Sequence, residues 1–169
     1  MRSFGNTRDR ITNFGHTLEK TIKTLGRKPY VKVGILGKDF DVQKKTSGEK
    51  TTWPKTVGAV AVYNEFGTEK IPERSFVRWT ADNRRPKWQT LSEHLRKPVI
   101  MGQAPVKKAL GLMGAVIQGD MQARISSNVP PPNSPATIAR KGKGSDSTTT
   151  LIDTGQMRAS VHYEVVNAS

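Results

Sequence analysis

The residue types that perform acid–base or nucleophilic chemistry are few and scattered along this sequence. The three histidines are His16, His94 and His162, and no G-x-S-x-G nucleophile elbow accompanies them. They also lack the i, i+4 pairing and the nearby carboxylates that a zinc site or a two-metal site requires. We interpret each histidine as a surface or boundary residue. The sequence therefore predicts no catalytic residue, no metal site and no cofactor, in a protein that is not an enzyme.

Two further segments contain the residue types of binding loops without the full pattern. Arg140–Ser145, RKGKGS, has the glycines and lysines of a phosphate loop, but the order G-x-x-x-x-G-K-[ST] is absent and no predicted strand leads into it. Asp39 and Asp41 lie among lysines with no third ligand beside them. We interpret the first segment as a solvated basic loop and expect no cation site at the second.

Basic residues are the more informative feature, because the formal net charge is +14 and the pI is near 10.3. Such a field attracts nucleic acid or acidic protein surfaces. DNA phosphates would be bound with salt-dependent affinity, whereas acidic neighbouring proteins are an equally good alternative because no aromatic platform is interleaved with the cations. The candidate contacts for DNA or an acidic partner are Lys44, Lys45, Lys50, Arg140, Lys141 and Lys143.

Length and composition bound the protein class. A chain of 169 residues is one ordinary domain, and its hydrophobic fraction of 34% is low for a globular chain, so part of it is expected to order only against a partner. The absence of cysteine excludes disulfides and a cysteine nucleophile. No apolar run is long enough to cross a bilayer and Met1 to Arg10 is polar, so we expect a soluble protein that has no signal peptide and is made in a reducing cytoplasm.

Hydrophobic periodicity places the helices and strands. Apolar residues at spacings of three and four predict helices over residues 6–25, 57–66, 82–97 and 105–127. Alternation predicts strands over 30–36 and 161–166, which we expect to pair with each other. Residues 68–80 are predicted to be extended, Pro98 to end the third helix, and a short helical turn to start near Thr154.

Three glycines interrupt the helix predicted over residues 105–127. Gly111, Gly114 and Gly119 each weaken a helix by roughly 1 kcal/mol relative to alanine, so we expect a close backbone approach to another element as compensation. Two extended polar segments are predicted, a mobile arm or long hairpin loop at 37–56 and a second long arm at 128–150. The expected fold is a single α+β domain over residues 1–169, with a small, mainly antiparallel sheet packed by two longer helices.

Two separated motifs resemble one known family. Tyr63–Thr80, YNEFGTEKIPERSFVRWT, resembles the E-F-G-T and P-x-R-x-F-[LV]-R elements of tail-completion and head-to-tail joining proteins of tailed bacteriophages. A second element, PPNSPATIARKG at Pro131–Gly142 followed by LIDTGQMRASVHYEV at Leu151–Val165, resembles the closing part of the same proteins. The chain departs from that pattern at Ser145–Thr150, an inserted Ser/Thr run, and at Trp79, where family members often have proline.

The resemblance implies a minor tail or neck protein with a role in virion assembly. The resemblance implies that its subunits form a ring, a hexamer, that completes the tail or joins it to the head. The implied partners are other copies, connector proteins, and tail tube or terminator proteins, together with DNA passing through the channel, but no membrane. The implied location is the virion, with host cytoplasm during assembly, and there are no catalytic residues to carry over. A basic protein that grips the genome end is the alternative function.

The motif residues supply the candidate contact surface. Gly67 suits a left-handed helix stop, Phe66 and Phe76 suit core or interface positions, and Arg74 is expected to pair with Glu65 or Glu73. Leu151, Ile152 and Met157 are predicted to anchor the second arm on its own body or on an adjacent subunit. The predicted residues of the oligomer or partner interface are Glu65, Phe66, Arg74, Phe76, Arg78, Ile138, Arg140, Leu151, Ile152 and Met157.

Overall fold

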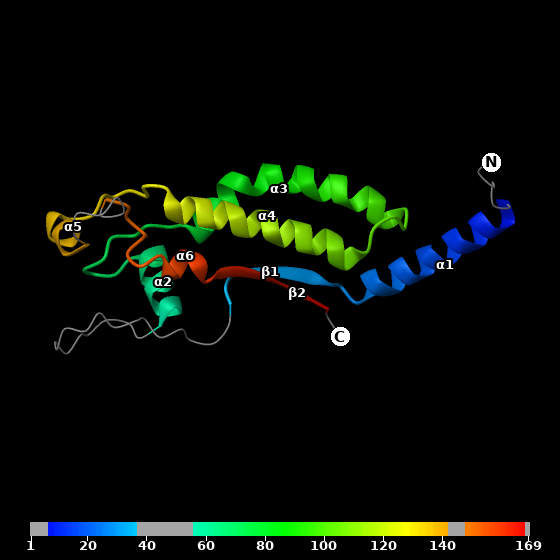
Figure 1. Cartoon of the computed structure of the whole chain (residues 1–169), viewed down its shortest axis with the longest axis horizontal. Helices are drawn as coiled ribbons and strands as arrows, with labels where there is room; N and C mark the ends of the chain where they lie inside the picture. The colour runs from blue at the N-terminus through cyan, green and yellow to red at the C-terminus, as the bar shows by residue number, and fades with distance from the viewer. Residues whose placement is uncertain (1–6, 37–55, 142–147, 168–169) are drawn as a thin grey trace.

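The computed structural model describes residues 7–36, 56–141 and 148–167 and shows an elongated α+β fold (Figure 1). Helices and strands alternate irregularly along the chain, and helices supply most of the described residues. In chain order the elements are α1 (Thr7–Gly26), β1 (Tyr30–Ile35), α2 (Val57–Phe66), α3 (Val77–Ile100), α4 (Val106–Ser126), α5 (Pro135–Lys141), α6 (Gln156–Ala159) and β2 (Val161–Val166).

The sheet consists of β1 and β2, paired antiparallel from Tyr30 opposite Val166 to Ile35 opposite Val161. This confirms the pairing that the alternation of the two segments predicts. Val33 and Ile35 of β1 and Val161 of β2 belong to the side of the ribbon that packs on the hydrophobic core. The sheet is thus a ribbon with one packed face, as period-two patterning requires.

Helix α4 lies between α3 and the sheet, contacting both (Figure 1). Gly114 permits this close approach, because a Cβ there would lie 2.5 Å from Cδ2 of Tyr163 and 2.9 Å from Cγ2 of Val31. The predicted close approach is therefore confirmed at Gly114. It is wrong at Gly119, where nothing lies within 4 Å, and at Gly111 the nearest atom is the Tyr163 hydroxyl at an ordinary 3.9 Å.

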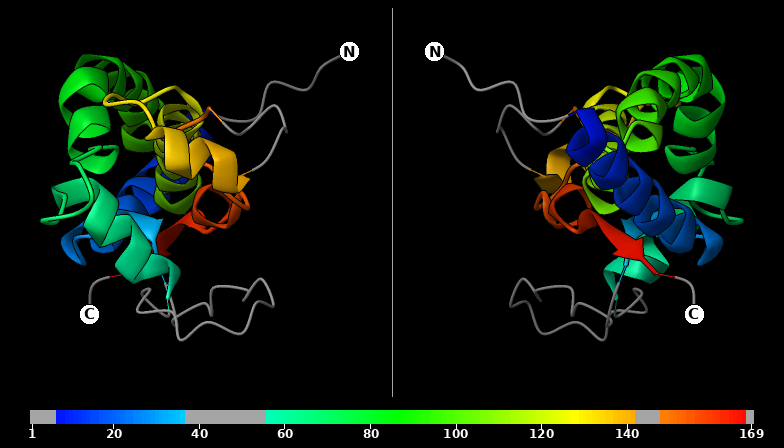
Figure 2. Two further views of the ribbon diagram at one scale, coloured as in Figure 1. Left: turned by 90° about the vertical axis from the view of Figure 1, so that its left-hand side faces the viewer. Right: turned by 90° about the vertical axis from the view of Figure 1, so that its right-hand side faces the viewer.

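The main core lies where α2, α6 and the end of α4 meet, toward one end of the molecule (Figure 1), and Figure 2 shows these elements along the long axis. Helix α2 is confirmed over the predicted range, with the Thr56 hydroxyl accepting the Ala59 N–H at 3.1 Å as its N-cap. Gly67 ends it with φ of 72° and ψ of 172°, a positive-φ backbone outside the left-handed helical region that we expected. The buried apolar residues of this core are Val57, Ala61, Phe76, Met121, Ile125, Val129, Leu151, Met157 and Val161.

Two sequence predictions about α3 are wrong. The helix begins at Val77 and not near residue 82, so residues 77–80 are helical and not extended. It also continues past Pro98 to Ile100, and Pro86 lies inside it and not in its first turn. The early start has a tertiary cause, because a carboxylate from α2 accepts hydrogen bonds from the first N–H groups of α3, as described below. Pro86 and Pro98 have no N–H, so α3 lacks the hydrogen bonds to the carbonyls of residues 82 and 94.

The two predicted arms have different outcomes. Residues 37–55 and 142–147 lie outside the described part of the chain, so the arm at 37–56 stays a prediction. The second arm is wrong as an extended segment, since Pro135–Lys141 forms helix α5. Pro135 suits the first helical position, and the Ser134 hydroxyl accepts the Thr137 N–H at 3.3 Å. The short turn predicted near Thr154 is confirmed as α6.

Candidate assembly site

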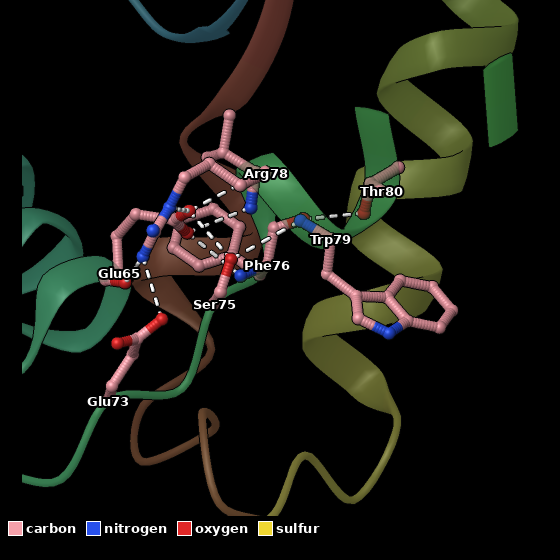
Figure 3. Close-up of polar contacts among 8 residues, drawn as sticks. Glu65, Glu73, Ser75, Phe76, Arg78, Trp79 and Thr80 are labelled. Carbon is pink, nitrogen blue, oxygen red and sulfur yellow. Dashed lines mark hydrogen bonds and ion pairs between the residues drawn. The ribbon is translucent and has the colours of Figure 1, made fainter. Parts of the chain in front are cut away.

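Glu65 is the centre of the first motif. Its side chain lies on the inner side of α2, and the residue is 5% exposed. Oε2 accepts the backbone N–H groups of Phe76 at 2.8 Å and Val77 at 2.9 Å, and Oε1 accepts the Arg78 N–H at 3.0 Å (Figure 3). The Ser75 hydroxyl donates to Oε1 at 2.8 Å. Because the first N–H groups of a helix have no intrahelical acceptor, Glu65 caps α3 across a gap in sequence.

The electrostatics of Glu65 favour its charged form. Burial alone would raise the pKa of this carboxyl, but the N–H groups of Arg78, Val77 and Phe76 and the Ser75 hydroxyl outweigh burial and lower the pKa. The carboxylate is therefore ionised at neutral pH. A buried charge with this many donors fixes the end of α2 against the start of α3.

Arg78 holds the same junction from the outside. Its Nε donates to Glu65 Oε1 at 3.1 Å, and its Nη2 donates to the Glu65 carbonyl at 2.6 Å and to Glu73 Oε1 at 2.8 Å. The hydrogen bond with Glu65 is the largest contribution to the raised pKa of Arg78. The prediction that Arg74 pairs with Glu65 or Glu73 is wrong, because Arg78 makes both ion pairs.

Arg74 instead joins the first motif to the second. Its side chain is buried, and it donates from Nε to the Pro131 carbonyl at 2.8 Å and from Nη2 to the Pro132 carbonyl at 3.1 Å. Burial lowers the pKa of the Arg74 guanidinium, which nevertheless stays charged at neutral pH. Two segments separated by 57 residues thus meet at one side chain.

The second motif packs against the body of its own chain. Leu151 and Met157 are buried in the core beside Phe76, and Ile152 is partly buried against it. The Lys141 ammonium donates to the Thr149 carbonyl at 2.7 Å and to the Ile152 carbonyl. Lys141 therefore points into the chain, and not outward as a contact for DNA or an acidic partner requires.

One side of α2 is apolar and exposed. Val57, Ala61 and Glu65 form the buried side, whereas Val62, Tyr63 and Phe66 are 53%, 40% and 62% exposed. We call these last three residues the α2 outer face. The Arg78 guanidinium carbon lies 4.8 Å from the Phe66 ring centroid, a cation–π contact that holds the ring at the surface.

The predicted interface residues are thus divided by the fold. Phe66 is exposed and does not pack in the core, because Val57, Ala61 and Glu65 occupy the buried side of α2. Val62 and Tyr63 are not among the predicted interface residues, although a helix segment that is apolar on both sides was the available signal. Among the remaining candidates, Glu65, Arg74, Phe76, Leu151 and Met157 are buried, Ile138 and Ile152 are half-buried, and Arg78 and Arg140 are exposed. Lys44, Lys45, Lys50 and Lys143 lie outside the described residues.

Within the described ranges, no three His, Asp or Glu side chains gather as metal ligands would. No helix in that same part of the chain has the length and apolarity needed to span a bilayer. Comparison of the chain with models of protein families, with curated proteins and with solved structures found no match.

Proposed function

We propose that this chain is a structural subunit of the neck or tail end of a tailed bacteriophage. Copies of it would associate into a ring that completes the tail, joins it to the head, or does both. The resemblance of the two motifs to tail-completion and head-to-tail joining proteins supports this role. Its work would be binding, in the host cytoplasm during assembly and then in the virion, without substrate turnover.

The observation that carries the proposal is the exposed Phe66 on a rigid buried support. Glu65 beside it is fixed by three backbone N–H groups at the start of α3 and by the Ser75 hydroxyl, so the position of Phe66 is set before any partner arrives. Such preorganisation reduces the entropy lost on binding. Aromatic residues and arginine are also both enriched at protein–protein interfaces.

The α2 outer face is apolar in a chain with a formal charge of +14. Exposed apolar residues grouped on one helix side are typical of protein–protein contacts, whereas DNA phosphates favour cations. A ring of identical subunits requires a heterologous contact, in which the α2 outer face meets a different surface of the next copy. The same face would serve connector, tail tube or terminator proteins if it lies at an end of the ring.

The experiment is a mass measurement on the purified protein by light scattering, together with electron microscopy of assembled particles. Phe66→Ser removes the phenyl group at an exposed position, so the free energy of unfolding should change by no more than about 0.5 kcal/mol. Leu112→Ser is the matched control, because Leu112 is 48% exposed on α4, away from the motif. We expect a ring for the wild type and for Leu112→Ser, but monomers and defective tails for Phe66→Ser. A wild-type protein that stays monomeric and never enters particles would refute the proposal.

The alternative function is DNA binding, which the charge of +14 favours. Its candidate cations are mostly outside the described residues, and the ammonium of Lys141 is directed to carbonyls of its own chain. A fluorescence titration against duplex DNA over a salt series separates the two roles. Tight binding whose affinity falls steeply with salt, and which is unchanged in Phe66→Ser, would favour the DNA-binding function. No binding at moderate salt would leave the assembly function.

A further inference from the structure

Neither edge of the β1–β2 ribbon pairs with another strand among the residues that the structure describes. Within the described residues these strands pair only with each other, so alternate residues of each strand direct backbone N–H and C=O groups away from the ribbon. Gln122 of α4 donates to the Val161 carbonyl at 3.2 Å, at the first residue of β2. A two-stranded ribbon is marginal by itself, and a third strand on either edge would satisfy these groups.

The sequence of the ribbon does little to protect these edges. Edge strands that avoid pairing usually carry proline, several lysines or a bulge. Strand β1, YVKVGI, has one lysine, and β2, VHYEVV, has no lysine; neither strand has proline, and the register between them continues without a bulge. The edges are therefore competent to accept another strand.

We infer that the free edge of β2 in one copy pairs antiparallel with the free edge of β1 in the next copy. The inference rests on the proposed ring and adds a strand-to-strand contact between neighbouring copies to the contact of the α2 outer face. The sheet would then run continuously through the assembly, with each copy contributing two strands. Because every copy offers one edge of each kind, the contact is heterologous, and closure of the ring leaves no edge unpaired.

Charge complementarity selects a second copy as the occupant. Lys32 lies directly opposite Glu164 in the register of the ribbon, and both side chains are exposed. Neither of them makes an ion pair with another described residue, and the Lys32 ammonium lies 5.7 Å from the Tyr30 ring centroid. Repeating the register across the junction would place Lys32 of one copy opposite Glu164 of its neighbour, so that the two charges alternate around the ring.

The same register also keeps the core-facing side chains of both copies on one face of the extended sheet. Residues that pack on the core in β1 would lie opposite residues that pack on the core in β2, so the apolar face would remain continuous. Pairing β1 with a second β1 would instead bring the two Lys32 side chains together. It would also form a closed twofold contact, which gives a dimer and not a ring.

Charge reversal tests the inference through mixing. In Lys32→Glu alone and Glu164→Lys alone, every junction between copies joins like charges. We expect each variant to need a protein concentration about tenfold higher than wild type for half-assembly. In an equal mixture of the two variants, alternating copies would restore opposite charges at every junction, whereas the pairs within each chain would remain mismatched. Assembly near the wild-type concentration in the mixture alone is the expected result; no recovery on mixing would overturn the inference.

Cysteine pairing gives a second readout that does not depend on charge. The native chain has no cysteine, and Tyr30 lies opposite Val166 in the ribbon. Tyr30→Cys and Val166→Cys are made in separate, differently tagged chains, and circular dichroism checks that each folds. Oxidation of the mixed assembly should yield the heterodimer. Dimers of Tyr30→Cys with itself, or a wild-type ring with no heterodimer, would refute edge pairing while the proposed ring stands. A monomeric wild type would refute the ring as well.

Discussion

Arg78 donates three hydrogen bonds to Glu65. The Glu65 carboxylate accepts the Arg78 N–H at 3.0 Å and its Nε at 3.1 Å, while Arg78 Nη2 donates to the Glu65 carbonyl at 2.6 Å. The first two bonds fix the start of α3, and the third fixes the end of α2. Since Phe66 follows Glu65 directly, the contact between Glu65 and Arg78 sets the position of the exposed Phe66 side chain, on which the proposed function rests.

Removing the Glu65 carboxylate should destabilise the fold strongly. Glu65→Ala leaves the N–H groups of Phe76, Val77 and Arg78 without their acceptor, so we expect a loss of about 3 kcal/mol in the free energy of unfolding. Urea denaturation measures it. Glu73→Gln is the control, because Glu73 is exposed and pairs only with the outer side of Arg78, and it should cost less than about 1 kcal/mol. Equal losses in the two variants would contradict the capping role.

Acid should weaken the same junction. The pKa of Glu65 is lower in the folded chain than its ordinary value, so its contribution is complete above the unfolded pKa and is lost as pH falls through the folded pKa. The pKa of Asp120 is also lowered, since hydrogen bonds from Lys87 and Trp88 outweigh the opposite effect of burial. We expect the midpoint of thermal unfolding to decline below about pH 4.3.

The variants Glu65→Gln and Asp120→Asn separate these two contributions to the acid dependence. Each should flatten the decline of the unfolding temperature between pH 5 and pH 2 compared with wild type. The double variant should flatten it further, because the two carboxylates lie on different contacts. A wild-type slope in Glu65→Gln would show that Glu65 is not the group that titrates.

Two glycine substitutions in α4 should change the free energy of unfolding in opposite directions. Gly114→Ala places a Cβ 2.5 Å from Tyr163 and 2.9 Å from Val31, so we expect a loss of about 1–3 kcal/mol. Gly119→Ala meets nothing within 4 Å and should stabilise the helix by up to about 1 kcal/mol. Chemical denaturation of both variants provides the comparison. Stabilisation by Gly114→Ala would mean that α4 does not approach the sheet this closely.

Loss of the Arg74 side chain should release the Pro131 segment. Arg74→Met keeps most of the apolar stem but leaves the carbonyls of Pro131 and Pro132 without a donor, at a cost of about 2 kcal/mol. Hydrogen exchange and limited proteolysis should show greater opening of residues 128–134 than in wild type. Arg85→Met, at an exposed position of α3, is the control and should leave both measurements unchanged.

Local patterns in the sequence determined the elements whose cause is local. The period of α1 and α4, the alternation of β1 and β2 and the turn at Gly67 all depend on residues within a few positions of each other. The close approach at Gly114 was also predictable, because a glycine inside a strong apolar helix needs compensation. The resemblance in the two motifs likewise belongs to the sequence, and it supplies the functional class that we propose.

Only the tertiary structure decided where α3 begins, which side of α2 holds Phe66, and which acceptors Arg74 and Lys141 reach. These outcomes depend on hydrogen bonds between distant segments, such as the one from Phe76 to Glu65 and the one from Arg74 to Pro131. A periodic pattern records which side of an element is apolar, but it carries no information on which polar groups meet after folding. Burial then decides the choice, because a charge removed from water must find its partner wherever the chain brings one.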